Sequence, residues 1–288
     1  MQIIDGGMIA FSAWHALKAR VEWPLTFQVP RMLRPLVEAA QDTCVVCWNG
    51  DSLWKRELWP AYRDRPEIWD EAGHADFDAM LGALAALGVV QYRTPHLEAD
   101  EALAALVHRF EGQEDLVLRS DDKDFMQLLS GSTWMEGRVR GRVRFADVKQ
   151  ILGVTPTYVA DLLALSGDKA DGIPRVLTPS AAIRLIESRG HVRDWIDRDL
   201  RVADPIKRRI EAGRDQLRVN LELVDLSAAA VRARGAPGEP LLKGWGSWDA
   251  ARAIGERTGI AWLRADQPPE PYRILREWGE RTRARIRL

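Results

Sequence analysis

Short apolar runs alternate with longer stretches of helical periodicity in the first half of the chain. Runs of strand length occur at residues 2–4, 43–48, 88–92, 115–119 and 132–135. Between them, apolar positions repeat at helical spacing over residues 76–87 and 98–110. This alternation predicts an α/β fold in which a mostly parallel sheet is flanked by helices.

The pattern changes after about residue 145, where the strand-like runs stop. Helical stretches separated by Gly- or Pro-marked turns cover residues 146–152, 157–165, 179–189 and 205–226. A Pro/Gly cluster at 235–240 precedes two more helical stretches, at 248–257 and 272–285. We therefore predict an α/β domain over residues 1–145, a helical region over 146–232, and a linker with a C-terminal helical extension over 233–288.

Composition narrows the class of protein only slightly. With 288 residues, of which 46% are hydrophobic, the chain can bury a full core. Its 41 basic and 42 acidic residues give a net charge of −1, which neither favours nor excludes a nucleic-acid partner. No apolar stretch approaches the roughly 18 residues of a membrane span, and no basic lead typical of a signal peptide is present. Cys44 and Cys47 form a lone C-x-x-C inside an apolar run, so we expect buried strand residues in a reduced, cytoplasmic compartment.

Acidic and amide side chains follow the predicted strands. Asp5 closes the first run, Asn49 and Asp51 follow the second, and acidic clusters come after the third and fourth. Because ligands of parallel sheets bind beyond the carboxyl ends of the strands, these groups are expected at one edge. The two later clusters contain Glu98, Asp100 and Glu101, and then Asp122 and Asp124. A further pair, Asp168 and Asp171, lies in a turn marked by Gly and Pro.

Each cluster alone also fits a structural role, as a helix cap or a turn. Gathered at one edge, however, the carboxylates would repel one another unless cations were bound. Oxygen ligands without histidine or thiolate suit Mg²⁺ or Mn²⁺. Two such ions, about 3.5–4 Å apart, could activate a water and stabilise the leaving oxygen in a displacement at phosphorus. The pattern therefore favours a phosphodiester-cleaving enzyme.

Several motifs resemble those of the 5′-nuclease family, which includes phage 5′→3′ exonucleases, flap endonucleases and the nuclease domain of bacterial DNA polymerase I. Residues 98–101 read E-A-D-E, similar to the family's E-A-D-D, and residues 120–128 resemble T-G-D-K-D-L-x-Q-L. Residues 167–174 resemble G-D-x-x-D-N-I-P, and Ile4-Asp5-Gly6 matches the family's opening. The resemblance extends over about residues 1–190.

This resemblance implies a PIN-like catalytic domain followed by a helix-three-turn-helix that grips duplex DNA, and cleavage at 5′ ends or 5′ flaps. The family's metal ligands correspond to Asp5, Glu98, Asp100, Glu101, Asp122, Asp124, Asp168 and Asp171, with Asp100 and Asp122 central to catalysis. Asn49 aligns with a metal-binding aspartate of the family, and Asp51 could substitute for it. A potassium ion at the helix-three-turn-helix is a further expectation.

The segment Pro60-Ala61-Tyr62-Arg63 resembles the family's P-x-Y-K, in which the basic residue faces the scissile phosphate and the tyrosine stacks on an end base. A surface arginine after a core tyrosine is the alternative interpretation. Ser12 replaces an early arginine of the family, so one phosphate contact of the family is either missing or supplied elsewhere in the chain. Few residues separate Arg63 from the next helix, so we expect a short gateway rather than a long helical arch.

Two further stretches are candidates for DNA contact. Residues 138–144 alternate arginine with valine or glycine, which predicts a β-ribbon carrying Arg138 and Arg140 toward DNA, or a solvated hairpin. In the turn after Pro174, the resemblance implies phosphate contacts, here from Arg175, Thr178 and Ser180. Nothing in these stretches suggests recognition of base sequence.

Our leading hypothesis is a metal-dependent 5′-nuclease that acts on DNA. An RNA primer or an RNA–DNA hybrid is a further candidate partner. We expect the protein to be a monomer. One alternative is a PIN-like ribonuclease, against which the helical region after residue 146 argues. The other is a catalytically weakened branched-DNA-binding or polymerase-accessory protein, which the residues Ser12, Asn49 and Arg175 favour.

Overall fold

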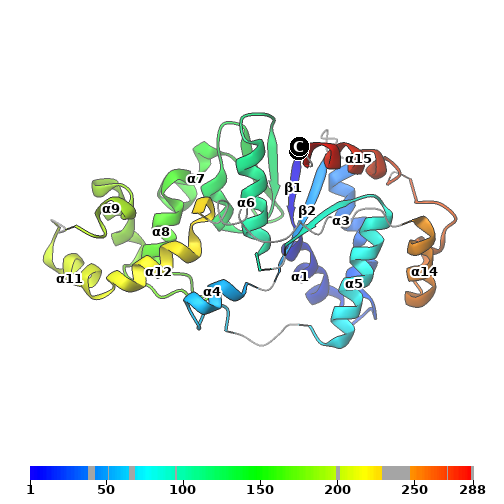
Figure 1. The fold of residues 1–288 in the computed structure, drawn as a ribbon, viewed down its shortest axis with the longest axis horizontal. Coiled ribbons are helices and arrows are strands. Elements are labelled where there is room, and N and C mark those ends of the chain that lie inside the picture. The colour runs from blue at the N-terminus through cyan, green and yellow to red at the C-terminus, as the bar shows by residue number, and fades with distance from the viewer. Residues whose placement is uncertain are drawn as a thin grey trace.

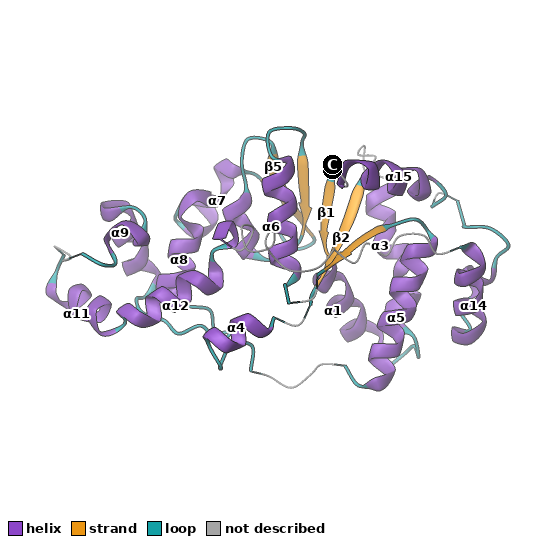
Figure 2. Ribbon diagram, in the orientation of Figure 1, coloured by secondary structure: helices purple, strands orange, loops and turns teal. Residues whose placement is uncertain are grey.

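The computed structural model describes residues 1–37, 43–50, 52–64, 69–94, 96–198, 202–228, 247–270 and 272–286. A six-stranded sheet with the order β3-β2-β1-β4-β5-β6 forms its centre (Figures 1 and 2). The strands are β1 (Gln2–Asp5), β2 (Cys44–Trp48), β3 (Val90–Arg93), β4 (Leu116–Arg119), β5 (Thr133–Gly137) and β6 (Gly141–Val143). The first five are parallel and β6 returns antiparallel to β5. The predicted mostly parallel α/β sheet is confirmed.

The helices around the sheet come from the first half of the chain and from its end. They are α1 (Gly6–Leu17), α2 (Pro24–Phe27), α3 (Val29–Val37), α4 (Leu53–Leu58), α5 (Glu71–Ala86), α6 (Ala99–Phe110), the 3-10 helix η1 (Lys123–Leu128), α14 (Trp248–Thr258), η3 (Ala261–Arg264) and α15 (Ile274–Ile286). Helix α6 contacts β1, β2 and β3, and the side chains beneath it belong to one apolar core. Helices α1, α2, α3 and α5 enclose a second core.

The helical region occupies the other end of the molecule in Figure 1. Its elements are α7 (Phe145–Leu152), η2 (Pro156–Tyr158), α8 (Val159–Ser166), α9 (Pro179–Arg189), α10 (Val192–Trp195), α11 (Asp204–Ala212) and α12 (Arg214–Val224). The prediction of one helix over 205–226 is wrong, because the chain turns at Gly213 between α11 and α12. A Cβ there would lie 3.2 Å from Val176, so the turn brings the backbone close to the segment that precedes α9.

The C-terminal helices complete the second core. Leu275 and Trp278 of α15 are buried in it, and the Thr282 hydroxyl accepts the backbone N–H of Cys44 in β2 (3.2 Å). A Cβ on Gly279 would lie 2.0 Å from the carbonyl oxygen of Gly88, so α15 and the chain before β3 are in direct backbone contact. The predicted linker cluster at 235–240 lies outside the described residues. Within those residues, no helix combines the length and apolar character needed to cross a membrane.

Candidate active site

Asp5 stands at the junction of β1 and α1. It caps α1 by accepting the N–H of Met8 (3.3 Å), and its second oxygen accepts the Ser120 hydroxyl (2.9 Å). A Cβ on Gly6 would lie 2.3 Å from the Trp48 ring, so glycine allows the helix to begin against the end of β2. Burial raises the pKa of Asp5, and the negative charge of Asp122 adds to this shift.

Asn49 follows β2 and ties it to the start of α6. Its side-chain oxygen accepts the N–H of Ala99 (2.7 Å), and its backbone carbonyl accepts the guanidinium of Arg93 (2.9 Å). The amide oxygen that would coordinate a cation is therefore already engaged at the helix N-terminus. Asp51, the predicted substitute, lies outside the described residues.

Glu98, at the N-terminus of α6, is almost completely buried and surrounded by four donors. Its oxygens accept Ser52 Oγ (2.8 Å), Lys55 Nζ (2.6 Å), Tyr62 Oη (2.9 Å) and Arg63 (2.8 Å). Burial alone would raise its pKa, but the charges of Lys55 and Arg63 outweigh it and lower the pKa to about 2. Glu98 thus holds the α4 segment against α6. Sequence reasoning missed this role because Lys55 belongs to none of the motifs that it considered.

Arg63 connects this cluster to the turn after α8. Its Nε lies 2.7 Å from one oxygen of Asp171 and its terminal nitrogen 3.2 Å from the other, while Asp100 lies 3.9 Å away. The backbone of Arg63 has the left-handed conformation (φ 47°), and its N–H donates to the carbonyl of Asp171. Trp59 adds a third link by donating to the carbonyl of Gly172 (3.0 Å).

Tyr62 does not fit the predicted stacking role. Its side chain is 2% exposed and its hydroxyl donates to Glu98, so neither face of the ring is open to a nucleobase. The tyrosine packs in the core, as the alternative interpretation of this segment expects. The neighbouring arginine reaches the site, which that interpretation does not expect.

Asp100 projects from α6 toward Asp5 at the same edge. Burial raises its pKa well above the ordinary value, and the charges of Glu98 and Asp5 raise it further. Glu101, one residue on, lies elsewhere. Its carboxylate accepts the N–H of Glu98 (2.9 Å) in a capping box, and its side chain is not among those that line the cavity described below.

A second acidic group surrounds η1. Asp122 caps this helix by accepting the N–H of Asp124 (3.0 Å). Burial, followed by the charge of Asp122, raises the pKa of Asp124 to about 7. One of its buried oxygens accepts no hydrogen bond but lies 3.5 Å from the Lys123 ammonium. Lys123 pairs with Asp168, and although burial opposes the shift, this contact lowers the pKa of Asp168.

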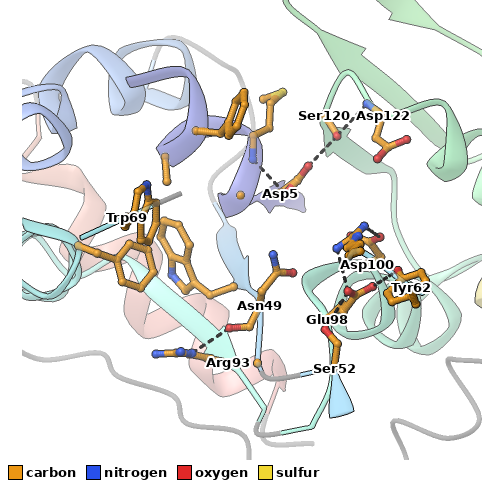
Figure 3. Close-up of a pocket in the computed structure, with 18 of the residues that line it drawn as sticks. Asp5, Asn49, Ser52, Tyr62, Trp69, Arg93, Glu98, Asp100, Ser120 and Asp122 are labelled. Carbon is orange, nitrogen blue, oxygen red and sulfur yellow. Dashed lines mark hydrogen bonds and ion pairs between the residues drawn. The ribbon is translucent and has the colours of Figure 1, made fainter. Parts of the chain in front are cut away.

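Asp5, Asp100 and Asp122 line a cavity of about 850 Å³ at the carboxyl edge of the sheet (Figure 3). Its polar wall is formed by Asp5, Asn49, Glu98, Asp100, Asp122 and Arg63. Its opposite wall is largely aromatic and includes the half-exposed Phe11, which the sequence analysis did not consider. The structure therefore divides the predicted ligands: five line the cavity, whereas Asp124, Asp168 and Asp171 stand beside it around Lys123 and Arg63.

The oxygen atoms of these side chains suit a hard divalent cation, but they do not form a complete coordination shell. Within the described part of the chain, no three His, Cys, Asp or Glu side chains form a group ready to hold a metal ion. The cavity nevertheless offers oxygen atoms, and burial raises the pKa values of Asp5, Asp100 and Asp124, so a bound cation would favour the ionised form of each carboxylate. One oxygen of Asp124 has no hydrogen bond and lies 3.5 Å from the Lys123 ammonium, so a positive charge already faces this carboxylate.

Residues 1–153 match the family model described as the 5′-3′ exonuclease, N-terminal resolvase-like domain. The chain belongs to this 5′-nuclease family. Among its relatives, a thermostable DNA polymerase I of Thermus filiformis is 30% identical over 239 residues, covering 77% of this chain and 28% of the polymerase. The flap endonuclease Xni of a Shewanella species (strain MR-4) is 27% identical over 187 residues, covering 63% of this chain and 71% of that enzyme.

Similarity of fold extends further than similarity of sequence. The flap endonuclease of bacteriophage T5, crystallised as a pseudo-enzyme–product complex with DNA and metal ions, superposes with a TM-score of 0.66 at 21% identity. The match covers 97% of this chain and 98% of the phage protein. Thus the predicted 5′-nuclease family and its PIN-like fold are confirmed, while the chain spans less than a third of the DNA polymerase I relatives that it matches.

This member of the 5′-nuclease family carries the residues predicted to contact DNA on exposed turns. Arg175, Thr178 and Ser180 are exposed at the start of α9, with Thr178 in the cap position. The predicted β-ribbon is a β5–β6 hairpin in which Arg138 and Arg140 occupy the turn.

Asp121, which the sequence analysis passed over, fixes that turn. Its carboxylate accepts the N–H groups of Arg138 and Val139, and its carbonyl accepts the Arg140 side chain. Asp121 stands where the family's motif has glycine, and that departure was the signal that could have revealed it.

Proposed function

We propose that this protein hydrolyses phosphodiester bonds of DNA at 5′ ends or 5′ flaps, using two divalent cations, Mg²⁺ or Mn²⁺. The observation that carries the proposal is the gathering of Asp5, Asp100 and Asp122 around one cavity with a raised pKa on Asp5 and Asp100. A fold that buries carboxylates together with like charges accepts a cost in stability that bound cations would remove. Arg63 places a positive charge on the same cavity.

The carboxylates that line the cavity and those that stand beside it suggest two cation positions. Asp5, Asp100 and Asp122, with Asn49 beside them, would hold one ion, and Asp124, Asp168 and Asp171 would hold the other. Glu98 and Glu101 are predicted ligands whose oxygens serve α4 and the α6 cap in this structure. Bound cations of this type lower the pKa of a coordinated water and neutralise charge that develops on phosphate oxygens.

The chain's own residues would bind and orient the strand. Arg63 is a planar guanidinium that can hold two phosphate oxygens at once, at the boundary between the cavity and the turn after α8. A phosphate entering the cavity would compete with Glu98 and Asp171 for this side chain. Lys123, paired with Asp168, supplies a second cation to the same edge.

The helical region would hold the duplex on the 3′ side of the cut. The N-terminus of α9 presents free backbone N–H groups together with Thr178 and Ser180, an arrangement suited to a phosphate. Arg175 and the hairpin residues Arg138 and Arg140 would add phosphate contacts. A potassium ion bound by carbonyls of the turn between α8 and α9 belongs to the same proposal. The DNA in the similar T5 flap endonuclease complex supports a DNA partner, whereas an RNA strand, a monomeric state and a cytoplasmic location stay predictions.

A second candidate function is DNA binding with weakened catalysis. It is favoured by Asn49, whose neutral amide replaces a carboxylate of the family's pattern and whose oxygen is engaged by Ala99. The retained carboxylates at the other positions weigh against it. A PIN-like ribonuclease is less well supported, because the exposed α9 turn suits a duplex partner.

The experiment is cleavage of a 5′-labelled DNA flap with Mg²⁺, with Mn²⁺ and with EDTA, alongside an RNA flap of the same sequence. The wild type and the control Asp215→Asn, whose carboxylate is 95% exposed on α12, should cut the DNA flap only with metal. The double variant Asp122→Asn/Asp124→Asn should bind the flap without cutting it. Binding without cleavage by the wild type would favour the second candidate, and faster cleavage of RNA would favour the ribonuclease.

A further inference from the structure

The cavity has a second wall whose chemistry differs from that of the carboxylates. Trp48 at the end of β2, Trp69 just before α5, and Phe77 within α5 all line it. The Trp69 and Phe77 rings lie 4.8 Å apart between centroids, and Trp48 meets Phe77 edge-on at 5.2 Å. Trp48 is buried, but Trp69 and Phe77 are each only partly covered and border open space. Figure 3 shows Trp69 on the side of the cavity opposite Asp100 and Tyr62.

The sign of the charge also changes across the cavity. Arg93 lies on the aromatic side, and it is exposed. Arg93 spans the two walls, since its Nε donates to the carbonyl of Asn49 (2.9 Å) and its guanidinium lies 6.0 Å from the centre of the Phe77 ring. Among the described residues that line the cavity, the acidic ones belong to the opposite wall.

The position of this wall relative to the helical region indicates which part of a bound strand would reach it. Helices α8, α9 and α12 lie on one side of the carboxylates, and α1 and α5 lie on the other (Figure 1). A strand whose duplex part rests on α9 and whose scissile phosphate reaches the carboxylates must continue toward α1 and α5. The continuing part is the 5′ portion, which in a flap is unpaired and exposes its bases.

We propose that the wall formed by Trp69, Phe77 and Arg93 binds the first unpaired nucleotide on the 5′ side of the scissile phosphate. Its base stacks on Trp69 and Phe77, and its phosphate lies against Arg93. The inference rests on the proposed function and extends it by assigning a nucleotide-binding site to this wall. Stacking needs only the face of a base, so the site selects for an unpaired nucleotide rather than for a sequence.

The test compares two 5′-flap substrates that differ only at the first unpaired nucleotide, which carries a base in one and is abasic in the other. The wild type should cleave the base-bearing flap with a kcat/KM about tenfold higher, the range expected for stacking of one base. The Trp69→Leu and Phe77→Leu variants should bring this ratio close to one. Trp69→Phe, which keeps an aromatic face, should retain most of the ratio, as should Trp262→Leu in the C-terminal extension.

A second measurement separates this inference from the proposed hydrolysis. With 2-aminopurine at the same nucleotide and Ca²⁺ as the metal, the wild type should quench its fluorescence and Trp69→Leu should not. Quenching in Ca²⁺ together with no cleavage of either flap in Mg²⁺ or Mn²⁺ would support the base site and overturn the hydrolysis. Cleavage at equal rates on both flaps, or an equal loss on both in the leucine variants, would overturn the base site alone.

Discussion

Arg63 and Asp171 form a bidentate ion pair, with nitrogen–oxygen distances of 2.7 and 3.2 Å, although 108 positions separate them in the chain. The pair joins the segment after α4 to the turn between α8 and α9. Because Arg63 also contacts Glu98, one guanidinium connects the carboxylate edge, the α4 segment and the proposed duplex-binding turn.

This link predicts different outcomes for two substitutions of Arg63. Arg63→Gln removes the positive charge and should lower kcat for flap cleavage at least about 100-fold, the range typical of a lost transition-state charge contact. Arg63→Lys keeps the charge but cannot form the fork, so kcat should stay within about tenfold while the free energy of unfolding falls by about 1–2 kcal/mol. Single-turnover kinetics and urea unfolding measure the two effects. Equal loss of kcat in both variants would argue against a phosphate contact.

The buried Lys55–Glu98 pair predicts a non-additive stability effect. The side chains are 3% and 1% exposed, so Lys55→Met leaves a buried carboxylate with one cation fewer. The expected cost is about 3 kcal/mol. Adding Glu98→Gln should recover part of that loss, because the double variant no longer buries the charge. Urea unfolding of the single and double variants forms the cycle, and strictly additive losses would show that the pair is not coupled.

The pKa of Asp124 predicts how stability depends on pH without metal. Because this pKa is about 7 instead of 3.8, the folded protein holds a proton that the unfolded chain has released between these values. The free energy of unfolding should therefore fall as the pH rises from about 4 to about 7. The raised pKa values of Asp5 and Asp100 act in the same direction.

Divalent metal should cancel this fall, because a bound cation favours the ionised carboxylates. Unfolding at several pH values with EDTA or with Mg²⁺ measures both parts. In EDTA at pH 8, Asp124→Asn should be more stable than the wild type and should gain less from Mg²⁺. A stability profile that is flat with pH, or unaffected by Mg²⁺, would rule out the buried charge as its cause.

We expect the substitution Asn49→Asp to increase the affinity for metal. Asn49→Asp adds a negative charge at the cavity and can still accept the N–H of Ala99, so the start of α6 is preserved. Affinity for Mn²⁺ should rise about tenfold, with lower stability in EDTA because another like charge is added. Asn49→Ala is the matched comparison: it loses the contact with α6 and should destabilise without any gain in affinity. Unchanged Mn²⁺ affinity in Asn49→Asp would place Asn49 outside the cation site.

The sequence predicted those features that depend on local pattern. Apolar runs located the five parallel strands, and the residues after them located Asp5, Asn49, Asp100 and Asp122 at one edge. It did not predict that Glu98 would be enclosed by donors, since Ser52 and Lys55 become its neighbours only when α4 folds back on α6. Nor did periodicity reveal the break at Gly213, which depends on the tertiary approach of Val176.

The aromatic wall shows the same limit. Trp48 and Trp69 come from elements that are distant in sequence, and only the fold brings both to Phe77. Residue type alone could not distinguish the buried Trp48 from the partly exposed Trp69.

The most direct test of the account is the number of Mn²⁺ ions that the protein binds, counted by electron paramagnetic resonance of the free ion. The wild type with a 5′-flap DNA should bind two ions per chain. Asp5→Asn should weaken the binding of one ion and Asp124→Asn the binding of the other, whereas Asp215→Asn should leave the binding of both ions unchanged. Absence of Mn²⁺ binding by the wild type, or two fully retained ions in both site variants, would contradict the assignment of these carboxylates as cation ligands.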